Sequence, residues 1–188
     1  MATQWQPRDA KLEDVQGMVR TDFSAFAGNP QREQRDGPEK TRVRLSDKYA
    51  KYINNPQRYK TIVVELNGVI ISIGVMDLKP LEEGITTPTR NGEYYSYNDV
   101  FLTYFAKYGE KFAMLRTLAT HEDNQRQGCG KAIFESLKAV AGVGEGRVIT
   151  VYSSAKGQAF YEKEGFELAG CCGEKPKVAT GYILHGCN

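Results

Sequence analysis

The sequence predicts an α/β (α+β) fold with a mixed central sheet flanked by helices. Apolar residues recur at helical spacing near the N-terminus, and two runs rich in Val and Ile surround Asn67-Gly68, a strong signal for a two-residue hairpin. Between Met114 and Ala141, a strand candidate, a glycine-bearing turn and an amphipathic helix follow one another directly. Helices and strands therefore alternate along the chain, and we expect them to pack as one structure.

The length and composition favour one folded domain. The 188 residues are enough to bury a core and too few for two ordinary domains. With 40% hydrophobic residues, 11 Tyr and 8 Phe, the chain is too apolar and too aromatic to be disordered. No internal repeat, low-complexity tract or linker divides it. We therefore expect a single domain over residues 1–188.

Charge and hydropathy argue against several classes of protein. The net charge is +2 and the basic residues are scattered among acidic ones, so nothing favours nucleic-acid binding. The chain has no apolar run of about 18 residues, and its N-terminus lacks the apolar stretch of a secretory signal. We expect no membrane association and a cytoplasmic protein. Four cysteines without Cys-x-x-Cys spacing and two histidines predict free thiols and no metal site.

Two helices are expected in the first part of the chain. The apolar face of the first is formed by Leu12, Val15, Met18, Val19 and Phe23. A loop over Gly28 to Lys40 follows, because its Gly, Pro, Gln and charged residues show no period. The second helix is expected from Arg42 to Ile53, ending before Asn54-Asn55-Pro56.

Strands are expected from the Val- and Ile-rich runs. Tyr59 to Leu66 and Val69 to Leu78 should pair as an antiparallel hairpin. An irregular connection is expected from Lys79 to Gly92, followed by an aromatic segment, Tyr94 to Tyr108, with helical character. Met114 to Thr120 is the next strand candidate.

The last third of the chain repeats the alternation. After the glycine turn, a helix is predicted by the spacing of Ile133, Leu137, Val140 and Ala141, and it should end at Gly142 to Gly146. Further elements are expected as a strand from Arg147 to Tyr152, a helix from Ser153 to Glu164 closed by Gly165, and strands from Phe166 to Gly170 and Thr180 to His185.

The segment from Leu118 to Ala132 carries the clearest chemical signal. It reads as a strand, a turn and a helix start, and amides at a helix start point toward one spot where the helix dipole favours an anion. Gly128 and Gly130 have no side chain that would obstruct a diphosphate. The segment is neither a dinucleotide fingerprint, because Ile133 occupies the third glycine position, nor a Gly-Lys-Ser/Thr P-loop.

Two motifs in this region resemble the GNAT acyl-CoA transferases. Gln125-Arg126-Gln127-Gly128-Cys129-Gly130 is similar to the Gln/Arg-x-x-Gly-x-Gly/Ala signature of that family, and Leu118 to His121 resembles the strand before it. Ser154 to Phe166, with its Tyr and its Gly-Phe ending, resembles the helix that follows in the family. The resemblance is specific from about Leu115 to Phe166, and it implies a fold in which two parallel strands splay apart.

The resemblance implies a site for acetyl-CoA (coenzyme A). The backbone of the first splayed strand would pair with the pantetheine arm, and the amides from Arg126 to Lys131 would hold the pyrophosphate. The other side of the cofactor would contact the segment that begins at Ser154. The implied cofactor-binding residues are Leu118, Ala119, Thr120, Gln125, Arg126, Gln127, Gly128, Cys129, Gly130, Lys131, Ser154, Lys156, Gly157 and Phe160.

Tyr161 corresponds to the tyrosine that protonates the thiolate leaving group in many family members, which makes it the expected general acid. The alternative is an aromatic packing residue on an amphipathic helix. For Cys129 no catalytic role is expected, although a helix N-terminus could lower a thiol pKa.

The sequence does not identify a general base. Where several family members carry a glutamate, this chain has Met114, with Arg116 and Thr117 nearby. Glu65, Asp99 and His121 are possible relays, and each has an ordinary structural explanation, as a solvated strand-end charge, a helix-start residue and a turn residue.

The resulting hypothesis is an N-acetyltransferase that moves an acyl group from acetyl-CoA directly to the amine of a small molecule. Tyr94, Tyr95 and Tyr97 could form the wall of an acceptor pocket, or they could be core residues. Two alternatives stay open: a protein or peptide amine as the acceptor, and a non-catalytic CoA-binding regulatory domain. The oligomeric state also stays open, a homodimer included.

Overall fold

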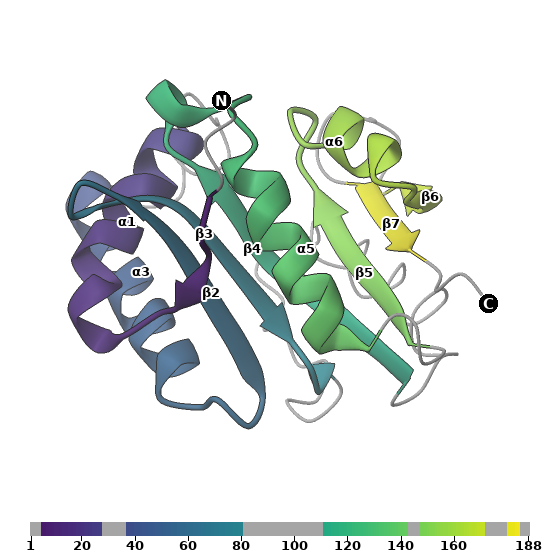
Figure 1. Ribbon diagram of the computed structural model, residues 1–188, viewed down its shortest axis with the longest axis horizontal. Coiled ribbons are helices and arrows are strands. Elements are labelled where there is room, and N and C mark those ends of the chain that lie inside the picture. The colour runs from purple at the N-terminus through teal and green to yellow at the C-terminus, as the bar shows by residue number, and fades with distance from the viewer. Residues whose placement is uncertain (1–4, 28–36, 81–110, 143–146, 172–179, 185–188) are drawn as a thin grey trace. The chain divides into compact units, whose positions relative to one another are not determined.

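The computed structural model describes residues 5–27, 37–80, 111–142, 147–171 and 180–184 (Figure 1). The chain divides into two compact units: Met1–Met76 with Thr117–Val140, and Asp77–Arg116 with Ala141–Asn188. Strand β4 (Phe112–Thr120) runs from the second unit into the first. The mixed α/β class is confirmed, whereas a single domain over 1–188 stays a prediction.

The first unit contains strands in the order β1 (Arg8–Asp9), β2 (Tyr59–Leu66), β3 (Val69–Asp77) and the C-terminal half of β4. The predicted hairpin between β2 and β3 is confirmed. Asn67 has φ 51° and Gly68 has φ 78°, the left-handed pair that a type I′ turn requires. Strand β1, which the sequence pattern did not reveal, pairs antiparallel with β2 through Arg8–Val63 and Asp9–Ile62.

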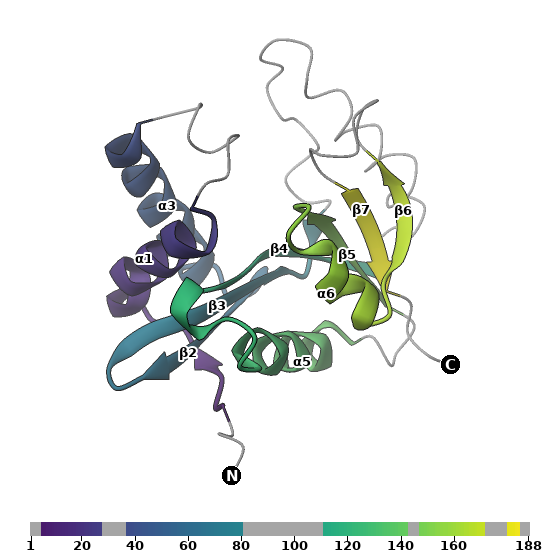
Figure 2. The same cartoon turned by 90° about the horizontal axis from the view of Figure 1, so that it is seen from above.

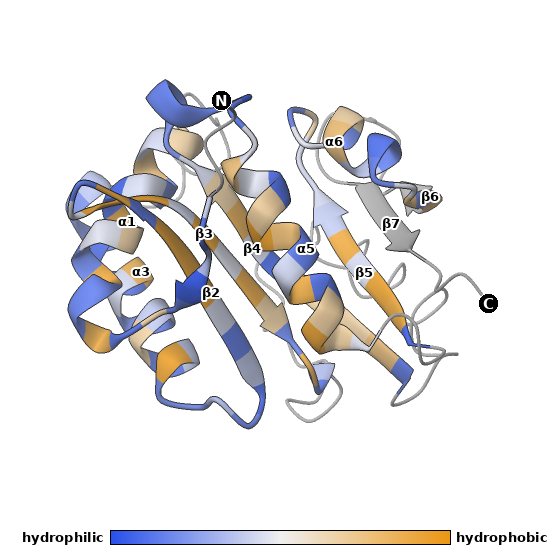
Figure 3. Cartoon of the chain, in the orientation of Figure 1, coloured by the Kyte–Doolittle hydropathy of each residue, from blue (hydrophilic) through white to orange (hydrophobic). Residues whose placement is uncertain are grey.

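Helices α1 (Val15–Ala25) and α3 (Pro38–Ile53) cover one face of β2 and β3, and α5 (Cys129–Ala141) covers the opposite face (Figure 2). The core between α1, α3 and the strands includes Met18, Leu45, Tyr49, Val63 and Ile73. Apolar residues are concentrated along the strands, while α5 carries apolar and polar residues side by side (Figure 3). Because successive strand residues face opposite ways, the Val- and Ile-rich runs can serve both faces.

In the first unit, helix boundaries differ from the prediction in two places. The loop predicted to Lys40 and the helix start predicted at Arg42 are wrong, because α3 begins at Pro38, and proline is favoured at the first helical position. Leu12 is 53% exposed because it belongs to a 3-10 turn, η1 (Leu12–Asp14), and not to α1 itself.

Helix α5 packs closely on β3. Ile133 and Leu137 are fully buried as predicted, and a Cβ on Gly74 would lie 2.3 Å from Ile133 Cγ2. The buried face of α5 is rotated from the predicted one. It includes Phe134, which is fully buried, whereas Val140, which was predicted on this face, is 45% exposed. The helix ends at Ala141 as expected, and Gly142 follows with φ 69°.

The second unit contains strands in the order β4 (its N-terminal half), β5 (Val148–Ser153), β7 (Thr180–Leu184) and β6 (Glu167–Cys171). Strands β4 and β5 are parallel, with pairs from Phe112–Val148 to Leu115–Val151. Strand β7 is antiparallel to both β5 and β6. The helix predicted over Ser153 to Glu164 is shorter: α6 spans Gln158–Lys163, because Ser153 completes β5 and Ser154–Gly157 forms a turn.

Other expectations fall on residues outside those described, including the connection beyond Pro80 and the aromatic segment Tyr94 to Tyr108. In the described ranges, no helix combines the length and the apolar character that a bilayer crossing requires.

Candidate functional site

The glycine turn joins β4 to α5 with two left-handed residues. After β4 the chain passes through η5 (Glu122–Asn124) and reaches Arg126, with φ 61°, and Gly128, with φ 92°. A Cβ at Gly128 would strain this backbone, so the conformation itself requires glycine there. Gly130 has a different role, since a Cβ there would lie 3.3 Å from Thr120 Oγ1, closer than most side chains approach.

The N-terminal end of α5 offers backbone donors. Ala132 N donates a 2.9 Å hydrogen bond to Gly128 O, which opens the helical ladder. The amides of Cys129 and Gly130 precede this bond, at the helix start where backbone N–H groups have no acceptor within the helix itself. Arg126 and Lys131 are exposed, and their positive charges add to the helix dipole. This end of α5 therefore has the chemistry for binding a diphosphate.

Side-chain bonds hold the turn in shape. Gln125 Nε2 donates to Thr120 O at 3.1 Å, and Gln127 Nε2 donates to Asp123 O at 3.0 Å. Trp5 Nε1 donates to Gln127 O at 2.7 Å, a contact that no local sequence signal indicated. The predicted residues Gln125 and Gln127 thus act on the turn's own backbone in this structure, in addition to any contact with a ligand.

Strand β4 presents alternate residues to its outer edge. His121 N donates to Ile71 O at 2.8 Å, so the backbone groups of His121, and of Ala119 two residues earlier, face β3. The backbone groups of Leu118 and Thr120 face away from β3. The ladder between β4 and β5 has its last pair at Leu115, so Leu118 and Thr120 lie beyond it. Of the predicted strand residues, Leu118 and Thr120 therefore have the orientation for pairing with an extended ligand, and Thr120 O in addition accepts the hydrogen bond from Gln125 Nε2.

The second unit holds Tyr161 at the end of a helix. Phe166 N donates to Tyr161 O at 3.0 Å and Gly165 N donates to Glu162 O at 3.1 Å, the bond pair of a Schellman motif. Gly165 has φ 86°, which this motif requires at its glycine. The Tyr161 and Phe166 rings lie 5.3 Å apart, which supplies the hydrophobic contact of the motif. The Gly-Phe ending of the sequence motif is thus explained by the way it fixes Tyr161.

Burial favours the protonated form of the Tyr161 hydroxyl. Only 7% of the residue is exposed, and burial raises the pKa of its hydroxyl above the ordinary value. The phenol therefore keeps its proton at neutral pH and can donate a hydrogen bond. Gly157 packs beside it, since a Cβ there would lie 3.1 Å from Tyr161 Cε2. The other predicted residues of this unit, Ser154, Lys156 and Phe160, lie on the same turn and helix.

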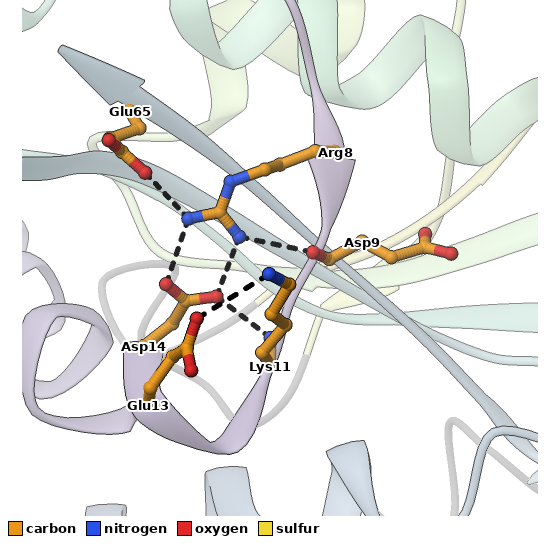
Figure 4. Close-up of polar contacts among 6 residues, drawn as sticks. All are labelled: Arg8, Asp9, Lys11, Glu13, Asp14 and Glu65. Atoms are coloured by element: carbon orange, nitrogen blue, oxygen red, sulfur yellow. Dashed lines mark hydrogen bonds and ion pairs between the residues drawn. The ribbon is translucent and has the colours of Figure 1, made fainter. Parts of the chain in front are cut away.

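The base candidates are engaged in contacts of their own. Glu65 accepts a 2.6 Å hydrogen bond from Arg8, which also binds Asp14 (Figure 4). His121 Nδ1 lies 3.5 Å from Asp123 Oδ2. Asp99 lies outside the described residues. Glu65 is 39% exposed, which agrees with a solvated charge at a strand end.

The residues at the position expected for a base do not include a carboxylate. Met114 is buried, Arg116 is paired with Asp77 at 2.7 Å, and Thr117 Oγ1 accepts a 3.2 Å hydrogen bond from Lys48 Nζ. Burial raises the pKa of the Cys129 thiol, and its Sγ donates to Asn124 O at 3.7 Å. Desolvation is the largest cause of this increase, and it opposes the lowering that a helix N-terminus could produce.

The family follows from a comparison with family models. The model of the acetyltransferase (GNAT) domain matches residues 57–168, more than half of the chain and a range that includes both the glycine turn and Tyr161. The chain belongs to the GNAT acetyltransferase family. This GNAT protein is therefore an acyltransferase, with acetyl-CoA as its donor and an amine as its acceptor.

Solved structures show the same fold at low sequence identity. The PaiA N-acetyltransferase of Thermoplasma acidophilum, in complex with coenzyme A, is 12% identical with a TM-score of 0.62, over 97% of this chain and 99% of that one. A protein described as histone acetyltransferase HPA2 and related acetyltransferase, from Corynebacterium glutamicum, is 16% identical with a TM-score of 0.67, over 99% and 98%. An N-acetyltransferase from Staphylococcus aureus Mu50 is 15% identical with a TM-score of 0.62, over 97% and 99%. No curated protein sequence matches this GNAT chain.

The described residues fit the donor's chemistry. The amides that open α5 and the exposed cations Arg126 and Lys131 suit a diphosphate, while the outer edge of β4 suits an extended amide-containing arm. The turn and strand residues lie in the first unit, and Ser154 to Tyr161 lie in the second.

Proposed function

We propose that this GNAT protein acetylates the amine of a small molecule by direct transfer. The donor supplies an acetyl group as a thioester. Leu118 and Thr120 would bind its pantetheine arm, the amides from Arg126 to Lys131 its diphosphate, and Ser154, Lys156, Gly157 and Phe160 its other side. The amine nitrogen forms a bond to the acetyl carbon, the carbon–sulfur bond breaks, and the products are an amide and a free thiol.

Tyr161 would donate a proton to the departing sulfur. The observation that carries this assignment is the burial of Tyr161 on a Schellman motif, which fixes its backbone and keeps its hydroxyl protonated. A developing thiolate accepts that hydrogen bond, which lowers the barrier to breaking the carbon–sulfur bond. The proton lost by the amine goes to water or to a base that we do not assign.

The choice of a small acceptor rests on the residues between β3 and β4. Tyr94, Tyr95 and Tyr97 supply rings with polar tips, the side chains that typically line enclosed pockets.

We propose a single domain over residues 1–188 and a cytoplasmic location, the latter supported by cysteines without a disulfide-framework pattern. Native mass spectrometry would show whether two chains associate.

Calorimetry with acetyl-CoA, followed by a thiol-release screen, tests the function. We expect binding, and thiol release with one or more small amines. Absence of binding at about 1 mM ligand, an affinity near −4 kcal/mol, would remove the proposal. Binding without release for any amine would favour a regulatory CoA-binding domain. Faster release with peptides than with small amines would favour a protein acceptor.

A further inference from the structure

Trp5 makes a contact that the acyl-transfer chemistry does not explain. It is the single tryptophan of the chain, and its indole Nε1 donates a 2.7 Å hydrogen bond to Gln127 O. The ring also covers Gly128, since Trp5 Cδ1 and Nε1 would lie 3.8 Å from a Cβ built there. The side chain thus both bonds and covers the turn that precedes α5.

The hydrogen bond controls the direction of one amide. The described residues contain no cis peptide bond, and in a trans peptide the carbonyl and the following N–H point in opposite directions. Because the indole holds Gln127 O on its own side, the Gly128 N–H must point away from Trp5. Glycine tolerates backbone angles of either sign, so without this bond the peptide plane could rotate and present its carbonyl instead.

The segment that carries Trp5 is itself firmly held. Just downstream, Arg8 and Asp9 pair with β2 as strand β1. Arg8 donates to both carboxylate oxygens of Asp14, at 2.7 and 2.9 Å, and to Glu65 at 2.6 Å (Figure 4). Asp9 forms a 2.5 Å ion pair with Lys60. Trp5 therefore contacts the turn from a segment fixed to the sheet.

We propose that Trp5 is a positioning residue for the donor's diphosphate, acting through the Gln127–Gly128 peptide. This inference rests on the proposed binding of the diphosphate at the start of α5. With the peptide in the observed orientation, an N–H dipole is available to the anion, whereas the rotated peptide would direct a carbonyl oxygen at it. Trp5 selects the orientation that attracts the anion, so the turn does not have to rearrange when the donor binds.

Binding measurements on two ligands separate this role from a general structural one. CoA contains the diphosphate, and pantetheine lacks it but keeps the arm. In Trp5→Phe, which keeps a ring over Gly128 and removes the donor, we expect CoA binding to weaken about tenfold while pantetheine binding is unchanged. The matched control is Lys138→Gln, which removes the ion pair with Glu135 on α5 and leaves the Trp5 donor and its segment in place, and it should bind CoA like wild type.

The single tryptophan provides a second measurement without any substitution. Its fluorescence should change when CoA binds to the wild-type protein and should not change with pantetheine. Wild-type CoA affinity in Trp5→Phe, or equal losses for both ligands in a folded variant, would overturn the inference and leave the proposed function intact. If Trp5→Phe does not fold, CoA binding to wild type without a fluorescence change would overturn it. Failure of wild type to bind CoA would remove both.

Discussion

Arg116 Nη2 lies 2.7 Å from Asp77 Oδ2, although Asp77 is fully buried and 30% of the Arg116 side chain is exposed. Arg116 Nε donates to the same oxygen at 3.1 Å, and Lys79 N donates to Asp77 Oδ1 at 3.1 Å. Both carboxylate oxygens at the end of β3 are therefore bonded, and the arginine supplies the positive charge that burial of the carboxylate requires.

Loss of that charge should be costly. We expect Arg116→Gln to lower the free energy of unfolding by about 3 kcal/mol, because it leaves the buried Asp77 carboxylate without its cation. Urea unfolding measures the change. The double variant with Asp77→Asn should recover part of the loss, since a neutral amide needs no cation. A single variant as stable as wild type would contradict this explanation.

A side chain at Gly74 should overpack the contact between β3 and α5. A Cβ there would lie 2.3 Å from Ile133 Cγ2 and 2.8 Å from Leu137 Cδ1, so Gly74→Ala is expected to destabilise by about 1–3 kcal/mol. Combining it with Ile133→Ala should cost less than the sum of the two single changes, because the space removed by one is returned by the other. Gly37→Ala, with no atom within 4 Å of the new Cβ, is the control and should cost under about 1 kcal/mol. Strict additivity in the double variant would rule out the steric cause.

Acid should weaken the hydrogen-bonded ion pair between Arg8 and Asp14 that Figure 4 shows. The hydrogen bond from Arg8 lowers the pKa of Asp14 below its ordinary value. A carboxyl whose pKa is lower in the folded state adds stability above its unfolded value, about 3.9, and this is lost as the pH falls through the folded value. Thermal unfolding from about pH 6 to pH 2 should therefore show a weaker acid dependence in Arg8→Gln than in wild type.

The control for this titration is Lys11→Gln. The Lys11 side chain is 67% exposed and its Nζ pairs with Glu13 at 3.5 Å, while its backbone N still donates to Asp14 Oδ2. The acid dependence of this variant should fall only slightly below that of wild type, because the Lys11 charge is the smallest of the causes that lower the Asp14 pKa. If both variants lose the same acid-dependent stability, the Arg8 hydrogen bond is not the cause.

Tyr161→Phe should separate proton donation from binding. The change removes the hydroxyl and keeps the ring that packs on Phe166, so we expect kcat to fall about 100-fold while the Kd for acetyl-CoA changes less than about twofold. Tyr59→Phe, at a buried tyrosine of the first unit, is the matched control and should keep the wild-type kcat. An unchanged kcat in Tyr161→Phe would remove the assignment of a general acid.

Local chemistry explains what the sequence could predict. Strands β2 and β3 were recognised because their Val and Ile residues flank Asn67-Gly68, whose two left-handed residues define the turn. The start of α3 is not predicted by the sequence, because Pro38 follows residues typical of a loop, although proline is also favoured at the first position of a helix. Strand β1 was missed since Arg8–Asp9 has no apolar pattern and is a strand only through its pairing with β2.

The candidate site likewise contains residues that the sequence predicts and one that it does not. The glycine turn and Tyr161 could be recognised because contiguous residues carry the motif and each glycine has a backbone reason, such as φ 92° at Gly128. Trp5 could not be recognised, because its bond to Gln127 joins residues 122 positions apart. A contact of that range depends on the finished fold and leaves no local pattern.

The two-residue turn at Asn67-Gly68 also bears on how fast the chain folds. A hairpin closed by so short a loop forms within about 1–10 μs, so β2 and β3 can associate early. Strand β4 must reach β3 although residues 78–111 separate the two strands in sequence, and bringing together residues so far apart in the chain carries a greater entropic cost. We therefore expect arrival of β4, and not hairpin closure, to limit the refolding rate.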